Sequence, residues 1–234
     1  DQIGEAIRLH QGLDRRSAED KAAAMLDLVG IPDPRRRIRE YPHQLSGGMR
    51  QRAMIAMALS CQPSLLIADE PTTALDVMVQ TQILDLLRGL QQELNLAVIM
   101  VTHDLGVVAG RTHETAVMYA GKIMEVQRAQ ALFGAPRHPY TKVLRDALPV
   151  ADPKQRHELA TLPGEVPSLV NPPPGCRFHP RCAYATDICR TVEPQMSILE
   201  VGDQVRCHHH ERLRANRDLT VHPLPQSTAS KDST

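Results

Sequence analysis

Two short apolar runs on either side of a long amphipathic stretch constrain the fold of this chain more than any other feature. Leu65 to Ala68 and Ala97 to Val101 have the length of buried strands, and apolar residues recur at helical spacing from Asp76 to Leu94 between them. Two strands joined through a helix lie parallel in one sheet, because a parallel pair needs a crossover connection. The sequence therefore predicts an α/β fold with parallel, buried strands.

Other periodic segments flank this unit. Apolar spacing predicts a helix within residues 1–30, with Ser17 and Asp20 as a capping box, and another helix over Gly47 to Ser60. Residues 31–44 are predicted as a loop. Further along the chain we expect a helix to start within residues 104–110, followed by a hairpin joined through Ala120-Gly121, with strands Ala116 to Tyr119 and Lys122 to Val126.

The composition changes in the C-terminal part of the chain. Residues 163–180 hold six prolines and little periodicity, and four cysteines lie between positions 176 and 207. Cys61 stands apart on the predicted helix, where we expect a buried, small apolar residue. We place a domain boundary near residues 135–150 and expect the polar C-terminal end to be disordered.

Charge and hydropathy exclude two classes of protein. Lysine plus arginine equals aspartate plus glutamate at 27 each, so the chain has no excess positive charge with which to bind nucleic acid. No apolar run approaches the roughly 18 residues of a membrane-spanning helix, and no signal peptide is visible. We expect a cytosolic protein that can still dock on a membrane protein.

The first motif with chemical content is a glycine turn before a helix. Ser46, Gly47 and Gly48 place a hydroxyl, two residues without side chains and a helix N-terminus together. Such a turn allows close approach of an anion to unpaired N–H groups, as in phosphate binding. The alternative is an ordinary turn with a serine cap.

Polar residues follow both apolar runs. Asp69 and Glu70 end the first run and His103 follows the second, so neighbouring strands bring all three to one sheet edge, where ligands bind in open α/β folds. One acid can hold Mg²⁺, the next can activate water, and the imidazole can contact a terminal phosphate. The alternatives are solvated acids and a capping histidine. Asp76 either caps the helix that follows or links two active sites across a dimer.

Together these residues resemble the nucleotide-binding domain of ABC transporters. Residues 45–52 (LSGGMRQR) resemble the ABC signature, 65–71 (LLIADEP) the Walker B strand, 73–76 (TALD) the D-loop and 101–104 (VTHD) the switch-histidine motif. Within that family, residues 41–48, 67–77, 137–141 (RHPYT) and the cysteine-bearing segment 175–189 resemble the ATP-binding subunits of dipeptide and oligopeptide importers.

The resemblance implies a domain plan: a partial P-loop NTPase core with parallel strands and a helical subdomain, followed by an irregular, Cys-rich extension. Residues 1–60 would form the helical subdomain and signature helix. Residues 61–135 would form the C-terminal half of the ATPase core, 136–212 the peptide-importer extension, and 213–234 a disordered tail.

The resemblance also implies a role for each motif residue. Glu70 would be the general base and His103 the sensor of the γ-phosphate, while Asp69 would serve Mg²⁺. Asp76 would communicate across the dimer. ATP held mainly by a partner subunit would be contacted by a set of signature residues, namely Ser46, Gly47, Gly48 and Gln51.

Several partners and a location follow from the same resemblance. A second ABC ATPase subunit, identical or different, would complete the nucleotide sites, and closure would drive transmembrane permease subunits supplied by a solute-binding protein. The protein would then lie peripherally on the cytoplasmic face of the cell membrane. No nucleic acid partner is implied.

One departure from the family pattern concerns the phosphate loop. The sequence contains neither GxxxxGKS nor GxxxxGKT, the two forms of the phosphate-loop motif. No other residue of this chain replaces the lysine of that motif. We interpret the chain as N-terminally truncated, and expect it to bind ATP poorly and hydrolyse it negligibly by itself. The other hypotheses are a non-transport ABC-type ATPase and a non-catalytic remnant or regulatory metal-binding module.

The clustered cysteines leave three alternatives. Cys176, Cys182, Cys189 and Cys207 lack the paired C-x₂-C spacing of zinc knuckles, and in a cytosolic protein they favour a metal over disulfides. Four thiolates on open loops suit a 4Fe–4S cluster, which some resembling importer ATPases carry. The second alternative is a zinc ion, bound with help from His208 to His210. The third alternative is that the cysteines bind no metal.

Overall fold

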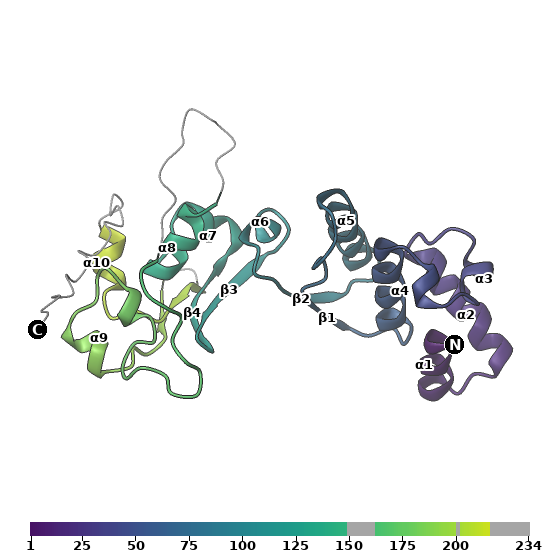
Figure 1. Ribbon diagram of the computed structural model, residues 1–234, viewed down its shortest axis with the longest axis horizontal. Helices are drawn as coiled ribbons and strands as arrows, with labels where there is room; N and C mark the ends of the chain where they lie inside the picture. Colours follow the sequence, from purple (N-terminus) through teal and green to yellow (C-terminus); the bar gives the residue numbers. More distant parts are fainter. Residues whose placement is uncertain (149–161, 200–201, 216–234) are drawn as a thin grey trace, which may run out of the picture. The chain divides into compact units, whose positions relative to one another are not determined.

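The chain folds into two compact units that meet along the sequence between His103 and Asp104. The computed structural model describes residues 1–148, 162–199 and 202–215. Each unit has its own sheet, one parallel and one antiparallel, so the fold is mixed α/β (Figure 1). The four-part division expected from the sequence stays a prediction.

The first unit combines a helical part with a two-stranded parallel sheet. In chain order its elements are α1 (Gln2–Gln11), α2 (Arg15–Leu28), α3 (Pro34–Arg37), the 3-10 helix η1 (Pro42–Gln44), α4 (Gly47–Leu59), β1 (Leu65–Asp69), α5 (Val77–Glu93) and β2 (Ala97–Val101).

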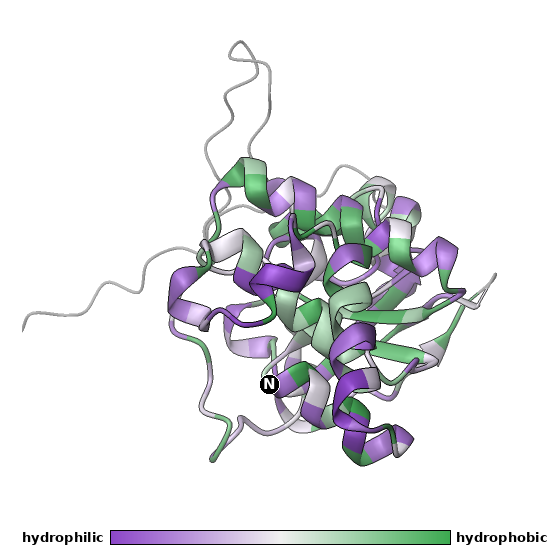
Figure 2. Ribbon diagram, turned by 90° about the vertical axis from the view of Figure 1, so that its right-hand side faces the viewer, coloured by the Kyte–Doolittle hydropathy of each residue, from purple (hydrophilic) through white to green (hydrophobic). Residues whose placement is uncertain are grey.

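The predicted parallel pair is confirmed. β1 and β2 align in register from Leu65 opposite Ala97 to Asp69 opposite Val101, and α5 is the crossover between them. Leu66 of β1 packs in one core with side chains of α4 and α5, among them Ile55, Leu59, Ile83 and Leu87. In Figure 2 the helices that face the viewer carry both apolar (green) and polar (purple) residues.

The sequence predicted that both faces of the two strands are buried, and the structure corrects this prediction. Ile67 is 63% exposed and Ile99 is 50% exposed, whereas Leu66 on the opposite face is 8% exposed. The core of this unit therefore covers only one face of the pair. A continuous apolar run cannot distinguish a strand covered on one face from a strand covered on both.

The N-terminal helical segment is interrupted, which corrects two predictions. A left-handed Gly12 (φ 67°) ends α1, and α2 begins after Asp14, whose carboxylate accepts from the backbone N–H groups of Arg16 and Ser17. Asp14 is thus the cap, and Ser17 donates its hydroxyl to that cap at 2.8 Å instead of forming a box with Asp20. The predicted loop 31–44 also contains α3 and η1.

Cys61 is a further correction. Helix α4 ends at Leu59, before the cysteine. Cys61 lies in a turn and is half-buried, with its thiol 3.8 Å from the carbonyl oxygen of Ala6. It is therefore neither helical nor fully buried.

The second unit is built on an antiparallel sheet with strand order β3-β4-β6-β5. Its elements are α6 (Leu105–Val108), β3 (Glu114–Tyr119), β4 (Lys122–Arg128), α7 (Ala129–Gly134), α8 (Pro139–Asp146), η3 (His179–Arg181), α9 (Asp187–Thr191), β5 (Ser197–Ile198), β6 (Gln204–Val205) and α10 (His210–Ala215).

The predicted hairpin is confirmed as β3 and β4. Ala120 and Gly121 both have left-handed backbones (φ 46° and 76°), as a two-residue turn that matches the twist of the strands requires. Rings of Tyr119, Tyr140 and Phe178 pack together beside this hairpin, with centroids 4.7 to 5.4 Å apart. This cluster joins the hairpin to α8 and to the cysteine-bearing segment.

The C-terminal segment is less irregular than predicted. β6 pairs with β4, with Val205 opposite Glu125, so residues far along the chain extend the hairpin sheet. Two-residue strands carry no periodicity that a sequence pattern can reveal. The predicted tail begins inside α10, which runs to Ala215, and residues 216–234 lie outside the described residues.

No helix within residues 1–148, 162–199 and 202–215 combines the length and the apolarity needed to cross a membrane.

Candidate functional site

The tips of β1 and β2 bring two of the predicted polar residues into contact. Asp69 ends β1, Glu70 follows it, and His103 lies beyond the end of β2. Nδ1 of His103 lies 2.9 Å from Oε1 of Glu70, and both side chains are exposed to solvent. Asp69 is also exposed at this edge. A carboxylate and an imidazole thus meet where an α/β sheet binds its ligands.

The backbone at Glu70 turns sharply away from the strand. Glu70 has a left-handed backbone (φ 44°), and its N–H still donates to the carbonyl oxygen of Val101 at 2.8 Å. Its own carbonyl oxygen accepts from the N–H of Thr73 at 3.1 Å, closing a turn. A left-handed non-glycine residue is uncommon and tends to occur at functional turns.

The turn returns a hydroxyl to the carboxylate that starts it. Thr73 donates its hydroxyl to Oε2 of Glu70 at 2.7 Å. That bond, followed by the contact with His103, holds the pKa of Glu70 below its ordinary value of 4.5. Glu70 is therefore an ionised, solvent-facing carboxylate that is contacted on both oxygens.

The glycine turn begins α4 and remains accessible. Ser46 is the cap, and its hydroxyl accepts from the N–H of Met49 at 3.3 Å. Ser46 and Gly47 are exposed, and Gly48 and Gln51 are half-buried. The preceding loop is fixed by Arg50, whose Nε donates to the carbonyl oxygens of Pro42 and Leu45 at 2.7 and 3.0 Å.

Asp76 caps α5, next to the glycine turn. Its carboxylate accepts from the N–H of Val79 at 2.9 Å, as the capping alternative expected. A methyl group at Gly48 would meet Cγ1 of Val79 at 2.8 Å, and one at Gly47 would meet Cδ2 of Leu75 at 3.5 Å. The start of α4 therefore packs against the start of α5.

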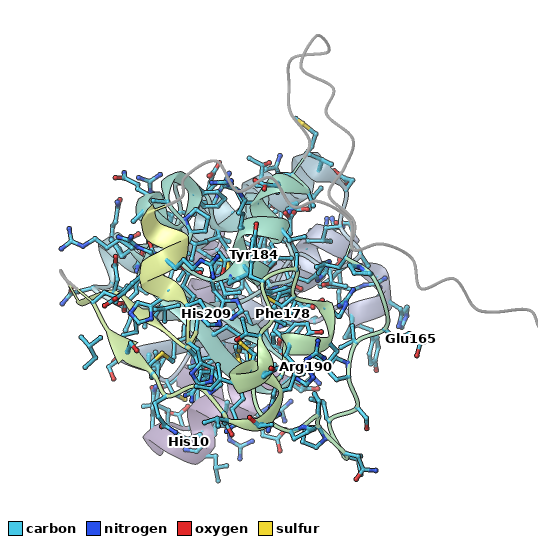
Figure 3. The ribbon with its side chains drawn as sticks, turned by 90° about the vertical axis from the view of Figure 1, so that its left-hand side faces the viewer. His10, Glu165, Phe178, Tyr184, Arg190 and His209 are labelled. Carbon is cyan, nitrogen blue, oxygen red and sulfur yellow. The ribbon has the colours of Figure 1, made fainter. Side chains whose placement is uncertain are left out.

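The four clustered cysteines line one small cavity in the second unit. Cys176, Cys182, Cys189 and Cys207 share it with aromatic and imidazole side chains, and its volume is about 20 Å³. Phe178, Tyr184 and His209 from this lining are labelled in Figure 3. That volume holds about one water molecule. The four cysteines that the sequence offered as metal ligands thus surround one cavity, and the metal itself stays a prediction.

The spacing of these thiols does not close a metal site. Across the described part of the chain, no three His, Cys, Asp or Glu side chains lie close enough together to hold a metal ion. Burial raises the pKa of Cys182 to about 12 and that of Cys207 to about 11. Thiols are weak ligands until they lose their protons, so binding a metal would have to displace these protons.

A glycine brings two of the cysteines together. Gly175 has a left-handed backbone (φ 69°), and a methyl group there would lie 2.5 Å from the carbonyl oxygen of Cys189. This close approach lets the N–H of Cys176 donate to the same carbonyl oxygen at 2.8 Å.

Sequence reasoning missed Thr73, Val79 and Gly175. The available signals were a hydroxyl residue three positions after Glu70, the standard spacing of a turn, and a glycine directly before the first cysteine. The contact between Gly48 and Val79 leaves no such signal, because it joins two helices.

Comparison with protein families divides the chain into two matched regions. Residues 2–73 match the family described as "ABC transporter". Residues 124–189 match the family described as "Oligopeptide/dipeptide transporter, C-terminal region". The first region contains the glycine turn, Asp69 and Glu70, and the second contains three of the four clustered cysteines.

Curated relatives match both regions at once. The dipeptide transport ATP-binding protein DppD of Escherichia coli is 54% identical over 209 residues, which are 89% of this chain and 63% of that protein. The oligopeptide transport ATP-binding protein OppD of Haemophilus influenzae is 50% identical over 207 residues, 88% of this chain and 64% of that protein. The chain thus spans slightly less than two thirds of the length of these relatives.

A solved structure supports the fold. A chain of an ABC transporter described as of the metal-chelate type, in an inward-facing conformation, superposes with a TM-score of 0.50 and 25% identity over 56% of this chain and 52% of that chain. With the two family matches and the curated relatives, this chain belongs, as a partial chain, to the ABC transporter ATP-binding proteins of the dipeptide/oligopeptide family.

Proposed function

We propose that this chain is part of the ATP-binding and ATP-hydrolysing subunit of an ABC importer for dipeptides or oligopeptides. The single observation that carries the proposal is the contact between Glu70 and His103 at the tips of two parallel strands. Family membership supplies the reaction, ATP plus water to ADP plus phosphate, and the names of the relatives supply the transported class.

Each residue at the strand tips has a distinct task in this proposal. Glu70 accepts a proton from the attacking water, for which its ionised state and exposed position suit it. His103 lies beside it and contacts the terminal phosphate. Asp69 offers the hard oxygen ligand that Mg²⁺ prefers, and the ion would neutralise phosphate charge there.

The second group of residues would serve a nucleotide held mainly by a partner subunit. Ser46 and Gly47 are exposed at the start of α4, where a helix N-terminus favours an anion. Gly48 and Gln51 complete that surface. Asp76 lies at the adjacent start of α5, so a change at the glycine turn reaches the D-loop through the contact of Gly48 with Val79.

The partners in this proposal are a second ABC ATPase subunit, transmembrane permease subunits and, through them, a solute-binding protein. The subunit would lie peripherally on the cytoplasmic face of the membrane. Since the sequence contains no phosphate-loop lysine, we propose that the chain alone does not hydrolyse ATP.

The test uses the complete subunit that contains these residues, assembled with its partner ATPase and permease. We expect Glu70→Gln to retain nucleotide binding and to lose turnover and peptide uptake. Asp85→Asn, an acidic residue on α5 away from the strand tips, is the matched control and is expected to behave as wild type. Steady turnover by the Glu70→Gln protein would remove Glu70 from the role of general base.

We also propose that the clustered cysteines hold a metal centre, either a 4Fe–4S cluster or zinc. Four thiols around one cavity match both donor sets in kind. In the present arrangement no three of these side chains, within the described residues, lie close enough together to hold a metal ion, so binding requires the thiols to rearrange around it. Such a centre would be structural or regulatory, since no residue of the strand tips belongs to this unit.

Metal analysis of the purified subunit tests this second proposal. We expect iron with acid-labile sulfide, or zinc, in a fixed ratio to protein, and loss of that metal in Cys189→Ser. Cys61→Ser is the matched control, because Cys61 belongs to the other unit. A protein prepared without oxygen that contains neither metal would contradict the proposal.

A further inference from the structure

The carboxylate of Glu70 is held at two points, by His103 and by Thr73, and the motif roles described above give Thr73 no task. His103 lies against Oε1 at 2.9 Å, and the Thr73 hydroxyl donates to Oε2 at 2.7 Å. We propose that Thr73 is a positioning residue for Glu70, which fixes the plane of the carboxylate that accepts the proton of the attacking water. The inference rests on the proposed role of Glu70 as general base.

The turn geometry explains why the hydroxyl reaches the carboxylate. The left-handed backbone of Glu70 reverses the chain, and the N–H of Thr73 closes the turn on the carbonyl oxygen of Glu70 at 3.1 Å. The Thr73 side chain therefore returns over the residue that starts the turn. Thr72 directly precedes Thr73 in the sequence and also carries a hydroxyl. Within the described residues, however, no hydrogen bond joins that hydroxyl to Glu70.

An exposed glutamate needs such a contact more than a buried one does. The side chain of Glu70 is 41% exposed, so without hydrogen bonds its carboxylate could rotate and present its oxygens in several orientations. General base catalysis requires the acceptor within hydrogen-bond reach of the proton that it removes. Threonine suits this task because its β-branched side chain has few rotamers, so the hydroxyl is already directed.

The contact leaves the carboxylate able to react. Each carboxylate oxygen accepts in more than one direction, so a bond from Thr73 to Oε2 does not block a water molecule on the same group. The hydroxyl donates and takes no proton, hence it does not compete with Glu70 as a base. Thr73 accordingly acts through Glu70 and touches no reacting atom.

The experiment compares three threonine variants in the complete subunit, assembled with its partner ATPase and permease. Thr73→Val keeps the shape and removes the hydroxyl, Thr73→Ser keeps the hydroxyl, and Thr72→Val makes the same change one residue away. We expect Thr73→Val to lower kcat on the order of tenfold with KM for ATP unchanged, since a hydrogen bond to a charged group has about that worth. Thr73→Ser should keep kcat within about twofold of the wild-type value, because the serine hydroxyl can make the same hydrogen bond.

Glu70→Gln in the same assay separates this inference from the proposed function. If Glu70→Gln abolishes turnover while Thr73→Val leaves kcat at the wild-type value, the positioning role is wrong and the general base stands. A Thr73→Ser protein as slow as Thr73→Val, or an equal fall in Thr72→Val, also overturns the positioning role. Steady turnover by Glu70→Gln overturns both, because Thr73 then has no base to position.

Discussion

Nδ1 of His103 lies 2.9 Å from Oε1 of Glu70, although 33 positions separate the two residues along the chain. The parallel register of β1 and β2 produces this contact, because each residue follows the carboxyl end of its own strand. The strand register sets where the two residues meet, and the turns that follow the strands, including the left-handed backbone of Glu70, complete the contact.

The first prediction concerns the imidazole of this pair. In the complete subunit with its partners, His103→Ala should lower kcat for ATP hydrolysis by about 10² or more, as expected for loss of one preorganised group at a reacting phosphate. His113→Ala is the matched control, since His113 is an exposed histidine of the other unit. A His103→Ala protein with wild-type kcat would exclude the imidazole from the reaction.

The strand tips were predictable from the sequence, and the reason is local. Two apolar runs ending in Asp69-Glu70 and before His103 can meet only if the strands are parallel neighbours, which periodicity and the crossover helix already indicate. The exposed face of Ile67 and Ile99 was not predictable, because burial depends on what packs against a strand.

Contacts between segments distant in sequence were also missed. The pairing of β6 with β4 joins Val205 to Glu125 through two-residue strands that have no pattern of their own.

The cap of α2 was missed for a local reason. Asp14 and not Ser17 caps α2, because Gly12 breaks the helical run just before it. The sequence shows several acceptable caps, and only the place where the preceding helix ends selects one of them.

The second prediction concerns the glycine that joins two cysteine segments. Gly175→Ala should lower the free energy of unfolding of the second unit by roughly 2–5 kcal/mol, from left-handed strain plus steric overlap. The overlap is with the carbonyl oxygen of Cys189 at 2.5 Å. Urea unfolding followed by circular dichroism measures the change.

Gly164→Ala is the control for Gly175→Ala. Gly164 has nearly the same backbone (φ 72° against 69°), and nothing lies within 4 Å of the added methyl group. This variant should show the strain alone, about 1–2 kcal/mol. Equal losses in the two variants would show that close approach to Cys189 is unimportant.

The third prediction concerns acid sensitivity of the second unit. Burial lowers the pKa of His138 from 6.5 to about 3, so between these values only the unfolded chain takes up a proton on this residue. Stability should therefore fall as the pH falls from about 6.5 towards 3. Burial raises the pKa of Glu125, whose carboxylate accepts from the N–H of His138 at 2.9 Å. The folded state therefore holds the proton of Glu125 more tightly than the unfolded chain does. This contribution to the free energy of unfolding is lost as the pH rises through the raised pKa, so it opposes the effect of His138.

His138→Asn isolates the imidazole in this trend. Asparagine does not titrate and can still accept from the N–H of Tyr140, which His138 does through Nδ1 at 3.1 Å. Urea unfolding at about pH 7 and about pH 5 should show a smaller loss of stability on acidification for His138→Asn than for wild type. The same pH dependence in both proteins would mean that His138 is not buried as a neutral imidazole.

The fourth prediction concerns the packing of the glycine turn against α5. A methyl group at Gly48 would lie 2.8 Å from Cγ1 of Val79, and valine cannot move that atom easily because its side chain is branched at Cβ. Overpacking in Gly48→Ala should lower the free energy of unfolding by about 1–3 kcal/mol. The better helix propensity of alanine should offset about 1 kcal/mol of that loss. Thermal unfolding of the first unit measures the difference.

Two further variants decide whether that contact couples the helices. Gly47→Ala meets Cδ2 of Leu75 at 3.5 Å, an ordinary contact, and should change stability by less than about 1 kcal/mol. In Gly48→Ala with Val79→Ala the space vacated by valine accepts the new methyl group, so the double variant should be more stable than the sum of the two single changes predicts. Additive effects would show that α4 and α5 are not coupled at this point. A non-additive result, in contrast, would show that the glycine turn and Val79 are energetically coupled, which the proposed link between the glycine turn and the cap at Asp76 requires.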